Sequence, residues 1–157
     1  MPMRGLFQLK TAADLRMKLR HELKALRSDP PNAYTAFNFF VTAEHLLDWR
    51  CPGSASEPQR RATRAAEVLL QITSHLANGA KHFEAQGKHH TPVANTGRAG
   101  DFFPSRYFSP RYFARRYFGG PVLIVELDGK AAATLGSSIT ALDLAEKVLA
   151  YWDAQSL

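Results

Sequence analysis

The sequence predicts a mainly α protein, a four-helix-type bundle with a small β-hairpin before the last helix. Three observations predict this class: long segments with apolar residues at helical spacing, capping residues at their starts, and one β-branched run that meets an Asp-Gly pair. The chain has 157 residues, of which 45% are apolar, which is the usual size of one domain. We therefore expect a single domain over residues 1–157.

The first helix is expected over about 12–27. Thr11 and Asp14 form a capping-box pattern at its start. Two rows follow at helical spacing, an apolar row and a basic row one residue later: Leu15, Leu19, Leu23 and Leu26, then Arg16, Arg20, Lys24 and Arg27. The basic row is either a solvated face or a phosphate-binding face.

Two further helices are expected over about 33–50 and 59–84. The segment 28–32 contains two prolines and separates the first helix from the second, and Pro52-Gly53 ends the second. Gly79 interrupts the apolar stripe of the third helix and costs about 1 kcal/mol of helix propensity against alanine. We expect another backbone to approach closely at that glycine.

The remainder of the chain contains the predicted β structure and the last helix. Residues 85–120 read as a polar loop followed by a repeat. A hairpin is expected over about 121–135, because the β-branched run 122–125 is followed by Asp128-Gly129, a dipeptide typical of tight turns. A last helix is expected over about 140–155, starting at Thr140.

The most informative feature is a pair of polar stripes on the two central helices. Both have the same offsets, and their members are Asn38, Thr42, His45 and Trp49 on one helix and Gln71, His75, Asn78 and His82 on the other. We expect the stripes to face each other, because an unpaired buried polar group costs about 1 to 3 kcal/mol. Three interpretations are open: a metal site, metal-independent chemistry on RNA, or a structural network that sets helix register.

Metal is the least favoured of the three interpretations. The available donors are His45, His75 and His82 with Glu44 or Glu84. His75 and His82 are seven residues apart, about 10 Å along a helix, which is too far for one ion. The Glu-x-x-His pattern of carboxylate-bridged iron bundles is also absent. We expect no metal.

The RNA interpretation comes from the segment ANGAKHF at residues 77–83, which resembles the signature of the HEPN superfamily of helical-bundle proteins. Asn78 and His82 match the polar residue and the histidine of that signature, and Ala77 stands at its arginine position. The resemblance implies that His82 acts as a general acid or base and that Asn78 orients the ribose hydroxyl or the phosphate. Lys81 or His75 would supply the missing cation, and Asn38 and His45 would contribute binding groups from the facing helix.

The most conspicuous pattern is the tripeptide RYF, which occurs three times at a spacing of five, from Arg106, Arg111 and Arg116. A period of five fits neither a strand nor a helix, so one regular element cannot place these aromatic residues on one face. Arginine beside exposed aromatic residues is typical of single-stranded nucleic-acid binding. The same composition also suits a segment that covers the bundle or mediates self-association, and this second interpretation is the one we favour.

Composition limits the function further. The net charge is +6, with basic residues concentrated in 1–29 and 97–120 and acidic residues after 121, which suits a polyanionic partner such as RNA. The apolar runs are far shorter than the roughly 20 residues that span a bilayer, so we expect no membrane association and a cytoplasmic location. The sequence contains none of the glycine-rich motifs that bind nucleotides, and we expect no cofactor.

Two functions remain open on the sequence. One is a HEPN-like protein that binds RNA or cleaves it without metal. The other is a non-enzymatic interaction module that forms homo-oligomers through the RYF repeat.

Overall fold

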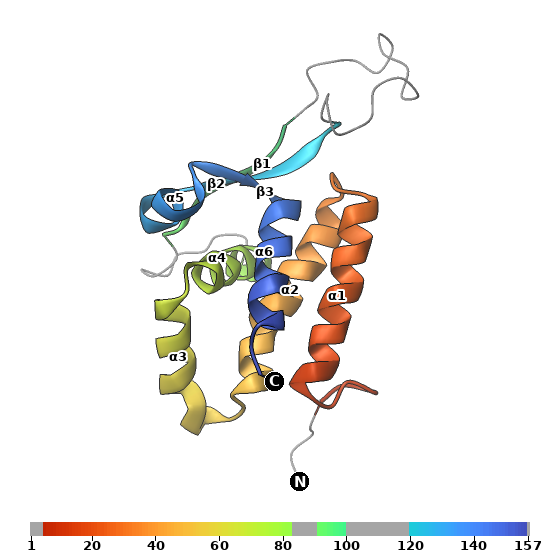
Figure 1. Cartoon of the computed structure of the whole chain (residues 1–157), viewed down its shortest axis with the longest axis vertical. Helices are drawn as coiled ribbons and strands as arrows, with labels where there is room; N and C mark the ends of the chain where they lie inside the picture. Colours follow the sequence, from red (N-terminus) through yellow and green to blue (C-terminus); the bar gives the residue numbers. More distant parts are fainter. Residues whose placement is uncertain (1–4, 83–90, 100–119, 157) are drawn as a thin grey trace.

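Figure 1 shows the computed structural model of the chain, which describes residues 5–82, 91–99 and 120–156. These residues form six α-helices, one short 3-10 helix and a three-stranded antiparallel sheet, so the predicted mainly α class is confirmed. The predicted set of four long helices with a hairpin is not confirmed. The third predicted helix is broken in two, and the hairpin segment contains a helix.

The first two helices lie where the sequence predicts them. α1 (Ala12–Ser28) begins with the expected capping box, in which the Asp14 amide donates to Thr11 Oγ1 at 3.1 Å. α2 (Ala33–Arg50) is capped by Asn32, whose side-chain oxygen accepts from two first-turn amides. All four leucines of the α1 apolar row are buried, as predicted: Leu15, Leu19, Leu23 and Leu26.

The predicted helix over 59–84 is two helices in the structure. A 3-10 turn at 54–56 leads into α3 (Glu57–Ala66), and α4 (Val68–His82) follows after Glu67. Glu67 has extended φ and ψ angles of −120° and 115°, and its carboxylate accepts the Leu69 amide at 3.1 Å. α3 buries none of its residues, whereas α4 carries core side chains. The break at Glu67 therefore lets α4 change direction and pack its side chains into the core, while α3 lies at the edge of the molecule below α4 (Figure 1).

The sheet lies over α4 and one end of α6 (Figure 1). Its strands are β1 (Val93–Ala99), β2 (Val122–Leu127) and β3 (Ser138–Thr140), in the order β1-β2-β3 with both pairs antiparallel. β1 falls in the segment that was expected to be a loop. It was missed because its residues are largely small or polar and exposed, without the apolar alternation that marks a half-buried strand.

The predicted hairpin over 121–135 is wrong. Asp128-Gly129 begins a helix, α5 (Gly129–Leu135), in which Asp128 Oδ1 accepts the Gly129 amide at 2.7 Å and Gly129 has φ of +52°. Aspartate is as common at a helix N-cap as in a turn, so the dipeptide alone does not distinguish the two. β2 consequently pairs with β1 on one side and with β3 on the other.

The last helix, α6 (Ala141–Asp153), is capped by Thr140 as predicted and packs against α1 and α2. Phe39 and Trp152 have no exposed surface and, with the α1 leucines, fill the space between these three helices. Within the described ranges, no helix combines the length and the apolar character that crossing a membrane requires.

Candidate functional site

The polar stripe on α2 does not form a site with α4. Asn38 and His45 are exposed, and His45 Nδ1 lies 3.8 Å from the Asp48 carboxylate of its own helix. Thr42 is buried against α1, where its hydroxyl accepts from Lys18 Nζ at 2.7 Å. The expected meeting of the two stripes is therefore not found among the described side chains, because α2 turns this face toward α1 and solvent.

The polar residues of α4 make mainly local contacts. Gln71 Nε2 donates to the Ala65 carbonyl at 2.8 Å, across the break between α3 and α4. Asn78 Nδ2 donates to the Ser74 carbonyl at 2.8 Å, one turn earlier in its own helix. Asn78 thus holds its amide against α4 and does not reach toward α2.

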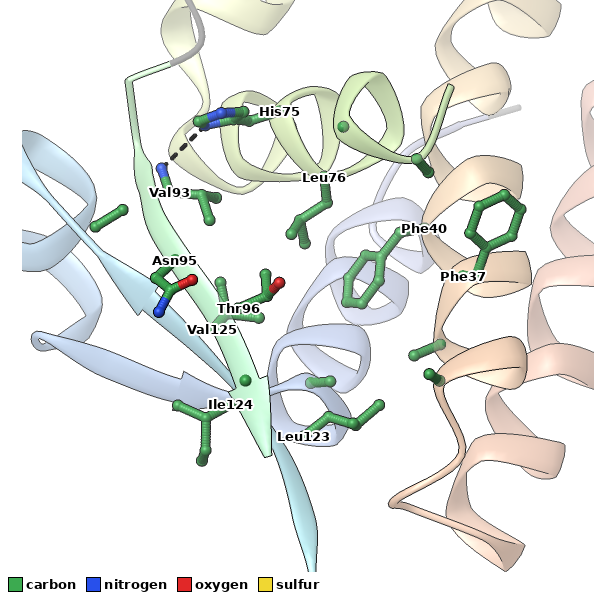
Figure 2. Close-up of a pocket in the computed structure, with 17 residues that line it drawn as sticks. Phe37, Phe40, His75, Leu76, Val93, Asn95, Thr96, Leu123, Ile124 and Val125 are labelled. Carbon is green, nitrogen blue, oxygen red and sulfur yellow. Dashed lines mark hydrogen bonds between the residues drawn. The ribbon is translucent and has the colours of Figure 1, made fainter. Parts of the chain in front are cut away.

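His75 joins α4 to the sheet. Its ring is half-buried, and Nδ1 accepts from the Val93 amide at 3.1 Å, the dashed contact in Figure 2. Burial lowers the pKa of His75 below its ordinary value of 6.5, which favours the neutral ring that can accept this hydrogen bond.

The other predicted site residues are not assembled with these. Lys81 is exposed near the end of α4. His82 is the last residue of α4, and its side chain lies outside the described residues. Arg106, Arg111 and Arg116 of the RYF repeat also lie outside them.

A polar cluster that the sequence did not reveal connects α2, α3 and α4. Arg64 Nη2 donates to Glu44 Oε1 at 2.7 Å, and the side chains of Arg64 and Glu44 are only 25% and 16% exposed. The buried Ser74 side chain also acts on the Glu44 carboxylate and lowers its pKa. Burial raises the pKa of Glu44 even though the Arg64 charge opposes that change. A carboxylate on a largely apolar helix was the available signal, but the sequence could not identify Arg64 as its partner.

The cluster borders a polar cleft of about 780 Å³. Arg61 extends into solvent from its rim with 79% of its side chain exposed, and its distance to Glu57 is 3.7 Å. Nε of Arg64 is buried and has no hydrogen-bond partner among the described residues. The lining of the cleft combines the two arginines with groups that donate and accept hydrogen bonds: Glu57, Arg61, Arg64, Ala65, Gln71, Ser74 and Thr91.

A second cavity, of about 600 Å³, lies between α2, α4 and the sheet. Figure 2 shows Phe40 reaching toward it from α2, Leu76 from α4, and Thr96 and Leu123 from the two strands. None of its 17 lining residues is Asp, Glu, Lys or Arg. This cavity therefore suits an uncharged group, whereas the polar cleft suits a charged one.

The basic row of α1 faces α6. Arg20 Nη2 donates to Asp153 at 2.8 Å, and Arg27 Nε donates to Glu146 at 2.9 Å. Arg16 Nη1 donates to a backbone carbonyl at the end of α6 at 3.2 Å. The charge asymmetry of the sequence is thus partly an internal pairing of the basic first helix with the acidic last one, and neither of the two sequence interpretations of this row anticipated it.

Comparisons with known proteins do not identify the chain. No protein-family model, no curated protein and no solved structure matches it. In the part of the chain that the structure describes, no three His, Cys, Asp or Glu side chains are grouped closely enough to hold a metal ion. The cleft and the cavity are therefore the features of the molecule that can indicate a function.

Proposed function

We propose that this chain is a HEPN-like protein that binds RNA, and that the cleft lined by Arg61 and Arg64 contacts RNA phosphates. The observation that carries the proposal is the pair of arginines in the cleft lining, of which Arg61 has 79% of its side chain exposed. The guanidinium group of arginine binds phosphate oxygens well because it can donate two parallel hydrogen bonds to them. Gln71, Ser74 and Thr91 add hydrogen-bonding groups on the same surface.

The nearby acidic groups do not rule out an anion. Glu57 lines the cleft, but its carboxylate is paired with Arg60 at 2.7 Å, and hydrogen bonding from Arg60 lowers the pKa of Glu57. Glu44 is paired with Arg64 Nη2 at 2.7 Å, so its charge is balanced within the cluster. Arg61 then carries the least compensated charge at the cleft.

We propose binding without cleavage. Ala77, at the arginine position of the HEPN signature, is buried, and the Asn78 amide is held by the Ser74 carbonyl. A scissile phosphate would find neither group ready to contact it. The cytoplasm is the expected location, and this expectation rests on the sequence.

RNA affinity measured by fluorescence anisotropy tests the proposal. A labelled single-stranded RNA should bind the wild type, with affinity that falls as salt rises. Arg61→Gln should weaken binding several-fold and reduce the salt slope by about 0.7, the value for one phosphate contact on a single strand. Lys24→Gln is the matched control, because Lys24 is exposed on α1 and remote from the cleft lining. Equal losses in both variants, or no salt-sensitive binding, would refute the proposal.

Cleavage is tested on the same RNA. We expect the wild type and His82→Ala to leave the labelled RNA equally intact in the absence of metal. Cleavage that is lost in His82→Ala would replace binding with ribonuclease activity as the function.

A second candidate is a non-enzymatic module that forms homo-oligomers through the RYF repeat. One observation favours it: Tyr34 and Phe37 at the start of α2 are 84% and 50% exposed, large apolar side chains of the kind that protein interfaces bury. Light scattering coupled to gel filtration should then give a dimer that dissociates when Tyr107, Phe108, Tyr112 and Phe113 are changed to Ser. A wild-type monomer at high concentration would eliminate this candidate.

A further inference from the structure

The cavity of about 600 Å³ is open because small residues surround it. Ala33, Ala36, Gly79, Ala80 and Ala141 line it from three helices. A Cβ placed on Gly79 would meet no atom of the described residues within 4 Å, apart from its own helix backbone and immediate neighbours. A pocket of this size with mainly apolar walls is typical of a ligand site, and exposed residues such as Phe37 and Thr96 leave it open to solvent on one side. Among the described residues, no backbone lies within 4 Å of a Cβ at Gly79, so the close approach that the sequence predicted there is not found in that part of the chain.

The lining defines the chemistry of a ligand. Phe37 and Phe40 provide aromatic surface from α2, and Leu123 and Val125 provide aliphatic surface from the sheet. Since no described residue of the lining carries a charge, these walls offer a charged ligand little compensation for lost hydration. The Thr96 hydroxyl and the neutral ring of His75 place polar atoms at the walls. A flat, uncharged ring with a polar edge fits this combination.

The cavity and the polar cleft are neighbours. Ser74 lines the cleft and His75, the next residue of α4, lines the cavity. On the other wall, Thr91 lines the cleft and Val93 lines the cavity. A polymer with phosphates and flat uncharged rings could place a phosphate in the cleft and a ring in the cavity.

We propose that the cavity accepts an unstacked nucleobase of single-stranded RNA while the Arg61–Arg64 cleft holds an adjacent phosphate. This inference rests on the proposed RNA binding and specifies the form of the RNA as single-stranded with one base extruded. Unpaired bases bind by stacking on aromatic side chains. Binding in the cavity should therefore favour single strands over duplex.

A cavity-filling variant tests the inference. Gly79→Leu places a side chain in the open space and also improves helix propensity, so it should fold with unchanged or higher stability. A short RNA containing 2-aminopurine reports base environment through its fluorescence. The wild type should change this fluorescence on binding, and Gly79→Leu should bind the RNA more weakly with that change abolished. Ala33→Leu fills the cavity from α2 and should act in the same way.

The outcomes separate the inference from the function on which it rests. RNA binding with equal fluorescence changes in the wild type and both filled variants would overturn the base site and leave the Arg61–Arg64 proposal standing. No RNA binding by the wild type would overturn the proposed function. Titration with adenosine or uridine alone, followed by NMR, would then show whether the cavity binds a base. Shifts of the Leu76 and Val125 methyl signals that Gly79→Leu abolishes would support a base site. The absence of such shifts would refute it.

Discussion

Gly79→Ala gives the sharpest stability prediction, because the structure states what the new methyl group meets. Gly79 lies inside α4 with no positive φ, and among the described residues its added Cβ has no atom within 4 Å outside its own helix backbone and immediate neighbours. Alanine is favoured over glycine in a helix interior by about 0.8 to 1.0 kcal/mol. The methyl group fills only part of the cavity and adds no clash. We therefore predict a gain of about 1 kcal/mol in the free energy of unfolding.

Thermal and urea denaturation followed by circular dichroism would measure this gain. For a chain of this size it corresponds to a rise of about 2 to 4 °C in Tm. Ala80→Gly is the matched control, because the next residue also lines the cavity and should lose a similar amount. A lower Tm for Gly79→Ala would mean that another group occupies the space, and the cavity argument would fail with it.

Three other predictions concern pH, charge and capping. The pKa of His75 is lower in the folded state than its ordinary 6.5, so the unfolded chain binds more protons and the free energy of unfolding should fall as the pH drops below 6.5. Urea denaturation from pH 5 to 8 should show this dependence. The substitution His75→Gln should make the free energy of unfolding less dependent on pH over that range. Asp153→Asn removes the 2.8 Å partner of Arg20 and should cost about 0.2 to 1 kcal/mol of unfolding free energy, less at high salt, since the pair is partly exposed; an unchanged Tm at low salt would contradict the pairing. Asn32→Ala removes the cap of α2 and should cost about 1 kcal/mol by the same denaturation assay, whereas no loss would show that the cap is redundant.

The sequence predicted the elements whose signals are local and consistent. α1, α2 and α6 each combine an N-cap residue with a stripe of large apolar residues, and all three lie close to their predicted bounds. α3 and α4 were predicted as one helix because periodicity continues through Glu67. The break depends on tertiary packing: none of the alanines of α3 is buried, whereas side chains of α4 pack into the core.

The candidate site was less predictable than the fold. Helical offsets placed Asn38 and His45 on one stripe but could not say which neighbour that stripe would face, and it faces α1 and solvent. Glu44 and Arg64 are 20 residues apart on different helices, and only the turn between α2 and α3 brings them to 2.7 Å. The cavity is lined in part by small residues, several alanines and Gly79, and no local sequence pattern predicts such a cavity.

The claim that RNA contacts the Arg61–Arg64 cleft is tested most directly by photo-crosslinking. RNA containing 4-thiouridine would be bound to the full chain, irradiated and digested, and the adducts located by mass spectrometry. We predict adducts in the peptides that carry residues 57–74, lost from those peptides in Arg61→Gln and retained in Lys24→Gln. Adducts confined to α1 or to the repeat at 102–118 would contradict the cleft as the RNA site.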